Sequence, residues 1–117
     1  RRLGKNMGNK IPSNYPILQF TEVARNDIQE TWQYFGEFNE GAAEKLIIQI
    51  IDKCEAISMN PKIGRERSEL VANLRQFPFK NYNIFYFPIE NGVEIYRVLH
   101  SSRDSVQVFE VEIDQPN

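Results

Sequence analysis

The hydrophobic period of this chain changes once, at Asn60-Pro61, and this change is what most constrains the fold. Before it, apolar residues recur every three or four positions, which is the spacing of one face of a helix. After it they alternate, which is the spacing of a strand with one buried face. Proline disfavours the helical region for the preceding residue, so a helix should end near Asn60. The pattern therefore predicts an α+β domain in which the helices precede most of the strands.

A short strand and two helices are expected in the first half. The strand is predicted at residues 17–20, and Thr21 is a suitable N-cap for a helix ending near Gly36. A second helix is predicted from about Ala42 to Met59, and its apolar stripe consists of Ala43, Leu46, Ile47, Ile50, Ile51, Cys54 and Ile57. The two helices are expected to form an antiparallel hairpin.

Three or four antiparallel strands are expected in the second half, with the helical hairpin packed on them. A loop is predicted at residues 62–72, followed by strands at residues 73–79, 82–89 and 93–100. The last two strands are joined by Glu90-Asn91-Gly92, because Asn-Gly tolerates positive φ in a hairpin turn.

Two positions in the second half are less regular. Pro88 lacks a backbone N–H, so its strand should be irregular there or lie at an edge. The tail at residues 106–113 is predicted to be a strand because it is rich in β-branched residues, although the spacing of Val106, Phe109 and Ile113 also fits a helix.

Composition excludes several classes of protein. A single cysteine, Cys54, rules out an internal disulfide framework, and with His100 as the single histidine a structural zinc site is not expected. Cys54 lies on the apolar stripe of a helix and is interpreted as a core thiol. No apolar run reaches the roughly 18 residues needed to span a membrane. We therefore expect a cytoplasmic protein with no metal, cofactor or membrane partner.

The net charge of −2 conceals an uneven distribution. Residues 11–61 contain three basic and eight acidic side chains, whereas residues 62–103 contain seven basic and four acidic ones. Residues 104–117 contain four acidic side chains and no basic ones. The near-neutral total argues against a general nucleic-acid binder, but it permits one basic working surface on the loop and sheet.

The first 14 residues differ from the rest, with four basic side chains and no acidic one. We expect residues 1–14 to be flexible and residues 15–117 to form one domain. Met7 is a plausible native start, which would make residues 1–6 an expression remnant. A nucleic-acid-binding arm is the alternative.

The stretch from Arg97 to Asp104 concentrates polar chemistry at a strand end and the following loop. It contains His100 and Arg103, and loops held by a rigid scaffold often carry function. Arginines there could bind phosphate or a partner's carboxylate through two parallel hydrogen bonds. The structural alternative is that Asp104 caps a turn, Arg103 pairs with a carboxylate and His100 is a strand-end hydrogen bonder.

Five short motifs together resemble the ParE/RelE superfamily of bacterial toxins, most closely its ParE branch. They occur in the family's order, at residues 60–65 (Asn-Pro-Lys-Ile-Gly-Arg), 74–75 (Leu-Arg), 82–86 (Tyr-Asn-Ile-Phe-Tyr), 94–100 (Glu-Ile-Tyr-Arg-Val-Leu-His) and 103–104 (Arg-Asp). The resemblance covers about residues 17–109, and its specificity lies in the order and spacing rather than in any single motif.

This resemblance implies a toxin of a type II toxin–antitoxin module, neutralised by a ParD-like antitoxin with a flexible C-terminal segment. A ParE-like toxin acts on DNA gyrase and is not itself a hydrolase. A RelE-like toxin cleaves mRNA on the ribosome with a cluster of basic side chains. An inactive protein-binding module of the same fold is the third alternative.

The residues favour the gyrase branch. The RelE-type site has an arginine after the first tyrosine of the 82–86 motif, where this chain has Asn83. It has lysines just before the Leu-Arg pair, where Val71 and Asn73 stand here, and a tyrosine where this chain has Phe109. Only Arg103 matches, so a ribonuclease would have to rely on His100 and Arg103.

No catalytic residue is predicted for the gyrase reading. The residues expected to contact the target are Arg65, Arg67, Arg75, Arg97, His100 and Arg103. Antitoxin contact is expected on the helix pair and the exposed sheet edges, giving a hetero-oligomer.

Overall fold

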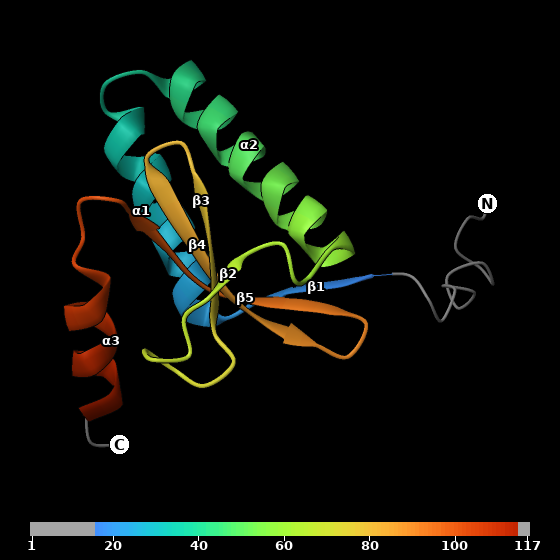
Figure 1. Cartoon of the computed structure of the whole chain (residues 1–117). Coiled ribbons are helices and arrows are strands. Elements are labelled where there is room, and N and C mark those ends of the chain that lie inside the picture. Colours follow the sequence, from blue (N-terminus) through green and yellow to red (C-terminus); the bar gives the residue numbers. More distant parts are fainter. Residues whose placement is uncertain (1–15, 115–117) are drawn as a thin grey trace, which may run out of the picture.

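A five-stranded sheet organises the chain, which we describe from a computed structural model covering residues 16–114, with side chains for residues 16–110 (Figure 1). The strand order across the sheet is β1-β5-β4-β3-β2. The strands are β1 (Ile17–Phe20), β2 (Arg65–Glu66), β3 (Arg75–Phe79), β4 (Tyr82–Ile89) and β5 (Gly92–His100). The predicted flexible segment, residues 1–14, lies outside the described residues.

The two predicted helices are confirmed and cover one face of the sheet. Helix α1 spans Glu22–Gly36, and the Thr21 hydroxyl accepts the backbone N–H of Ala24 at its N-cap. Helix α2 spans Glu40–Met59 and is capped in the same way by Asn39. Their apolar sides pack on the sheet in a cluster of buried residues: Ala24, Ile50, Cys54, Ile57, Tyr82, Ile84, Tyr86, Val93, Ile95 and Val98.

Cys54 is confirmed as a core thiol. Its side chain is fully buried, and burial raises the pKa of the thiol to about 12. The thiolate is the reactive form of cysteine, so the native protein should resist alkylation at neutral pH.

The central antiparallel strands agree with the predicted ranges. Strands β3, β4 and β5 pair antiparallel in sequence order, and β1 adds to the free side of β5 in parallel. Strand β3 starts at Arg75 rather than Asn73, because Asn73 adopts φ 70° in the preceding turn. The predicted loop at residues 62–72 contains the two-residue strand β2.

Pro88 lies where β4 has only one neighbour, as expected. The pairing of β3 with β4 ends at Arg75 and Tyr86, whereas Pro88 pairs with Val93 on the β5 side. The missing N–H is therefore tolerated at a partly open edge.

The prediction of a strand at residues 106–113 is wrong. This segment belongs to helix α3, Ser105–Asp114, on the face of the sheet opposite α2 (Figure 1). Asp104 starts the helix, because its carboxylate accepts the backbone N–H of Gln107 at 3.3 Å. Phe109 decides the outcome by packing into a second buried cluster with Leu74, Phe85 and Leu99. This tertiary contact overrides the weak β-propensity of the valines.

Candidate functional site

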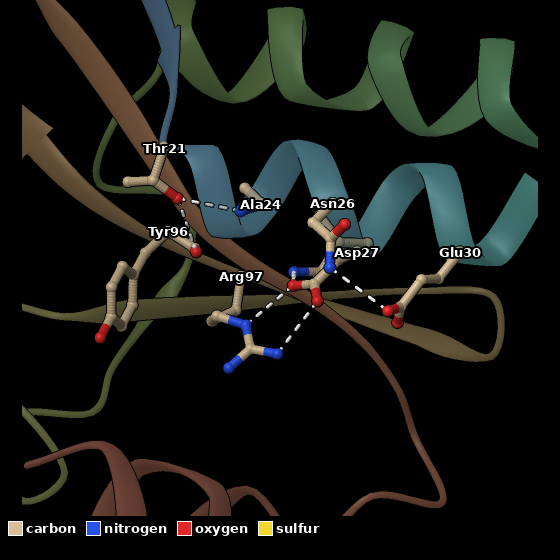
Figure 2. Close-up of polar contacts among 8 residues, drawn as sticks. Thr21, Ala24, Asn26, Asp27, Glu30, Tyr96 and Arg97 are labelled. Atoms are coloured by element: carbon tan, nitrogen blue, oxygen red, sulfur yellow. Dashed lines mark hydrogen bonds and ion pairs between the residues drawn. The ribbon is translucent and has the colours of Figure 1, made fainter. Parts of the chain in front are cut away.

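Arg97 is buried in an ion pair with Asp27 of α1 and is only 8% exposed (Figure 2). Its Nε lies 2.8 Å from Asp27 Oδ2 and its Nη2 lies 3.0 Å from Oδ1, so the contact is bidentate. The same carboxylate accepts the backbone N–H of Val98 at 3.0 Å. Arg97, predicted to contact a target, therefore has a role inside the fold.

The position of this ion pair follows from the short first strand. Strand β1 pairs with β5 only as far as Phe20 and Ile95, which leaves the rest of the β5 edge without a neighbouring strand. Side chains from the start of α1 bind the polar groups of that edge instead. The Thr21 hydroxyl donates to the Tyr96 carbonyl (Figure 2). The Asp27 carboxylate accepts the backbone N–H of Val98. Buried backbone polar groups need such partners.

Arg75 and Tyr86 hold the loop that contains the 60–65 motif. Arg75 Nη1 donates to the carbonyls of Lys62 and Gly64. The Tyr86 hydroxyl accepts the Gly64 N–H at 2.8 Å and donates to the Pro61 carbonyl at 2.7 Å. A Cβ at Gly64 would lie 2.6 Å from the Tyr86 hydroxyl oxygen and 2.9 Å from the Gln76 carbonyl oxygen, which explains the glycine.

Replacing Tyr86 with phenylalanine should lower the free energy of unfolding by about 1–3 kcal/mol, because buried loop groups lose a partner. Burial also raises the pKa of the Tyr86 phenol above its ordinary value of 10.0. A raised folded-state pKa gives stability that is complete below pH 10 and lost as the pH rises through the folded-state value. Urea unfolding at neutral and alkaline pH should therefore show a shallower alkaline decline in Tyr86→Phe.

The exposed Tyr34, 62% accessible, provides the matched control for this experiment. Tyr34→Phe should change stability by less than about 0.5 kcal/mol. An equally small effect of Tyr86→Phe would contradict the proposed loop clamp.

Arg67 is also engaged within the fold. Its Nε lies 2.6 Å from a carboxylate oxygen of Glu69, and its Nη1 donates to the side chain of Gln76. That ion pair lowers the pKa of Glu69. Three of the six predicted contact residues, Arg67, Arg75 and Arg97, therefore have hydrogen-bond or ion-pair partners that shape the domain.

The other three predicted residues, Arg65, His100 and Arg103, are exposed. The three ion pairs within residues 16–110 involve neither Arg65 nor Arg103. Arg65 lies on β2, three strands from β5, a separation of about 14 Å at the usual strand spacing. The structure thus brings His100 and Arg103 together and leaves Arg65 apart.

His100 presents a defined hydrogen-bond donor. Its Nδ1 lies 3.1 Å from the backbone N–H of Ser102, which can only donate, so Nδ1 accepts. In the neutral ring, Nε2 therefore carries the proton. The ring also meets Tyr82 edge-on, with centroids 5.2 Å apart. The backbone N–H of Arg103 donates to the His100 carbonyl at 2.9 Å, which keeps the two residues adjacent.

His100 and Arg103 line a cleft of about 320 Å³ between α1 and the loop after β5. The cleft is lined on the α1 side by Asp27, Glu30, Thr31, Tyr34 and Phe35, and on the sheet and loop side by Tyr82, Val98, Leu99, His100, Ser102 and Arg103. Burial raises the pKa of the Tyr82 phenol above its ordinary value.

The α1 side of this cleft was absent from the predicted site. One signal pointed to it: Asp27 lies between Ala24 and Ile28 on the apolar side of the predicted helix, where an acidic residue needs a partner. Its pairing with Arg97 spans 70 positions in the sequence and required the fold.

Neither a metal site nor a membrane span is found within the described part of the chain. Residues 16–110 contain no group of three or more histidine, cysteine or acidic side chains placed to hold a metal ion. None of the described helices is both long and apolar enough to cross a membrane.

Comparison with known proteins identifies the fold and the family. The family described as "ParE toxin of type II toxin-antitoxin system, parDE" matches residues 18–105. The chain belongs to the ParE toxin family. A solved structure described as the chromosomal ParDE TA system from P. aeruginosa has a similar fold, with a TM-score of 0.65 and 15% sequence identity. The alignment covers 75% of this chain and 98% of the other. No curated protein matches this chain.

The family assignment confirms the resemblance predicted from the five motifs. In this ParE toxin, Gly64, Arg75, Tyr86 and Arg97 from those motifs support the loop and the sheet edge. Among the motif residues that line the cleft, His100 and Arg103 are exposed and polar.

Proposed function

We propose that this ParE toxin inhibits DNA gyrase, and that it does so without ribonuclease activity of the RelE type. The observation that carries the proposal is the position of Phe109, which stands where the RelE-type site has a tyrosine. Phe109 is 1% exposed, and its ring lies 4.9 Å from Phe85 and 5.7 Å from Tyr96. This residue is a core side chain beneath α3 and offers no proton to a substrate.

The other RelE-type positions also have packing or turn roles. The Asn83 side chain accepts a hydrogen bond from Gln76 at 2.7 Å. Val71 packs against the second buried cluster, and Asn73 forms the turn before β3. Among these positions, Arg103 alone retains a charged side chain that faces solvent, which supports contact with a target rather than cleavage of RNA.

The proposed target surface consists of His100 and Arg103, with Arg65 as a separate contact on β2. We propose a ParD-like antitoxin as the physiological partner, forming a hetero-oligomer with the toxin in the cytoplasm, where gyrase acts. Large exposed apolar side chains on the helix pair support a protein partner: Trp32 and Tyr34 on α1, Phe38 between the helices and Ile48 on α2, which are 43–73% exposed.

Induction in a bacterium tests the proposed target with two readouts. We expect filamentation, a DNA-damage response and covalent gyrase–DNA complexes, while translation continues. Rapid translation arrest with cuts in mRNA at the ribosomal A site would instead support a ribonuclease that uses His100 and Arg103. If induction does neither and antitoxin co-expression has no effect, a protein-binding module becomes the better interpretation.

Reversing the charge at Arg103 should abolish growth inhibition. Arg103→Glu places a carboxylate on the proposed contact surface, and like charges across an interface cost several kcal/mol. The measurement is colony survival after induction, with equal protein levels verified by immunoblot. Lys45→Glu is the matched control, because Lys45 is an exposed residue on the outer side of α2. Full toxicity of Arg103→Glu would remove Arg103 from the target surface.

A further inference from the structure

Two lysines come together where the β3–β4 turn meets α2. The ammonium nitrogen of Lys53, on α2, lies 5.4 Å from the centre of the Phe77 ring and 5.5 Å from that of Phe79. The ammonium nitrogen of Lys80, in the turn, lies 5.9 Å from the centre of the same Phe79 ring. An aromatic ring attracts a cation that lies over it, so these contacts hold both ammonium groups at one corner of the domain.

The backbone at Lys80 also points to a role for this side chain. Lys80 has φ 53°, in the left-handed region that favours glycine. A lysine in this conformation costs free energy that glycine would avoid, which indicates that the side chain contributes something of its own. Lys80 is exposed, so its charged end reaches solvent.

This corner is continuous with the proposed target surface. The backbone N–H of Ser101, in the loop after β5, donates to the Asn81 carbonyl in the turn at 2.7 Å. Tyr82, directly after the turn, pairs with His100, and their rings meet edge-on. Figure 1 shows the turn between α2 and the loop after β5. Lys80 is therefore held beside the loop that carries the target surface.

The cations along this line have no carboxylate partner among the described side chains. We call Lys53, Lys80 and Arg103 the basic strip. The three ion pairs within residues 16–110 include none of them. They come from α2, the β3–β4 turn and the loop after β5, so the strip crosses three neighbouring elements of the fold.

The acidic side chains near the strip are mostly engaged elsewhere. Asp104 accepts a backbone N–H at the start of α3, and Glu30, across the cleft from Arg103, accepts a hydrogen bond from Asn26. Asp52 is the one carboxylate that borders the hollow between α2 and the turn. The strip thus keeps an excess of positive charge for an anionic partner.

A row of separated cations fits the phosphate backbone of DNA better than it fits a protein. DNA repeats its negative charge along its whole length, and lysine and arginine supply many of the contacts that proteins make to phosphate. A protein partner would need three carboxylates at matching positions. The net charge of −2 keeps the attraction to free DNA weak, in agreement with the sequence, which argues against a general nucleic-acid binder.

We propose that the basic strip contacts the phosphate backbone of the DNA held by gyrase. This inference rests on the proposed function, because it requires a target that is bound to DNA. A contact that is weak in free solution becomes effective there, since binding to the target makes it intramolecular, at an effective concentration in the millimolar range. The toxin therefore favours the DNA-bound state of its target over the free enzyme.

Salt-dependent DNA binding tests the strip directly. A fluorescein-labelled DNA duplex is titrated with the full chain at several salt concentrations, and its fluorescence anisotropy is measured. We expect a Kd on the order of 10⁻⁴ M at physiological salt, within the range of non-specific binding. The logarithm of the affinity should fall with the logarithm of the salt concentration with a slope of about −3, because each neutralised phosphate contributes about −0.9.

Matched variants assign this slope to the strip. Lys53→Gln and Lys80→Gln should each reduce its magnitude by about 1, whereas Lys80→Arg keeps the charge and should leave it unchanged. Lys62→Gln is the control, because Lys62 is exposed at the opposite end of β3, where its carbonyl accepts from Arg75. An unchanged slope in both strip variants, or an equal reduction in Lys62→Gln, would overturn the proposal.

The gyrase reaction separates the strip from the choice of target. With purified gyrase and DNA, Lys80→Glu should yield about tenfold fewer covalent gyrase–DNA complexes than the wild type, because one phosphate contact is lost. Its affinity for gyrase without DNA should be unchanged. Equal yields from the two proteins would reject only the strip. The expected salt slopes without any gyrase–DNA complexes from the wild type would instead reject gyrase as the target.

Discussion

Replacing Asp27 with alanine is expected to lower the free energy of unfolding by about 3–5 kcal/mol, a large part of the total stability of a domain of this size. The change leaves the buried Arg97 guanidinium without its bidentate partner and removes the acceptor of the Val98 N–H. Guanidinium chloride unfolding measures the effect. Asp27→Ala should lower the free energy of unfolding more than Arg97→Ala does. The reason is that the Asp27 carboxylate both pairs with the Arg97 guanidinium and accepts the backbone N–H of Val98 at the strand edge.

A double variant provides the control for this prediction. The variant with both Asp27→Leu and Arg97→Met removes the two charges together and should be markedly more stable than either single alanine variant, since no buried charge is left unpaired. The Val98 N–H remains without its acceptor, so the double variant should stay below the wild type. Costs below about 1 kcal/mol for both single variants would show that the pair is solvated, contrary to its burial.

Replacing Phe109 with alanine is the second change with a large expected effect, about 3–5 kcal/mol. Phe109 is the buried anchor of α3 and contacts the rings of Phe85 and Tyr96. Its loss creates a cavity under the helix, so hydrogen exchange in α3 should accelerate more than exchange in β4. Thermal unfolding and amide exchange measure the two effects.

Val106→Ala is the matched control on the same helix. Val106 is 45% exposed, so its truncation should change stability by less than about 0.5 kcal/mol. If Phe109→Ala left α3 as protected as in the wild type, the helix would be held by contacts other than this ring. That result would also weaken the argument that position 109 is reserved for packing and unavailable for catalysis.

The elements with strong local signals could be predicted from the sequence. Helices α1 and α2 have regular apolar stripes and side-chain caps at Thr21 and Asn39, and the pairing of β4 with β5 follows from alternation around an Asn-Gly turn. These signals lie within a few residues of the structure that they specify. The order of the five motifs was likewise enough to indicate the ParE family.

Helix α3 and the parallel pairing of β1 depended on contacts that are distant in the sequence. The valines of α3 have a local preference for strands, and only the packing of Phe109 on the sheet reverses it. Strand β1 pairs with β5 across more than 70 positions in the sequence. The pattern of apolar residues within β1 does not indicate which strand it pairs with.

The candidate site was predicted in part for the same reason. His100 and Arg103 lie close together because three positions separate them, at the end of a strand. Arg67, Arg75 and Arg97 looked equally suited to contact a target, since a motif arginine has the same sequence signature whether it binds a partner or its own chain. In the structure, their partners at Glu69, Gly64 and Asp27 lie within the domain.

The sequence by itself determined the α+β class, the two long helices, the central hairpin and the family. Local periodicity indicates the first three, and the order of the motifs indicates the family. The tertiary structure alone decided which charged side chains are available to other molecules. A side chain is available only if the fold leaves it without a buried partner, and those partners come from elements far apart in the chain. The cleft lined by Tyr34, His100 and Arg103 is the result.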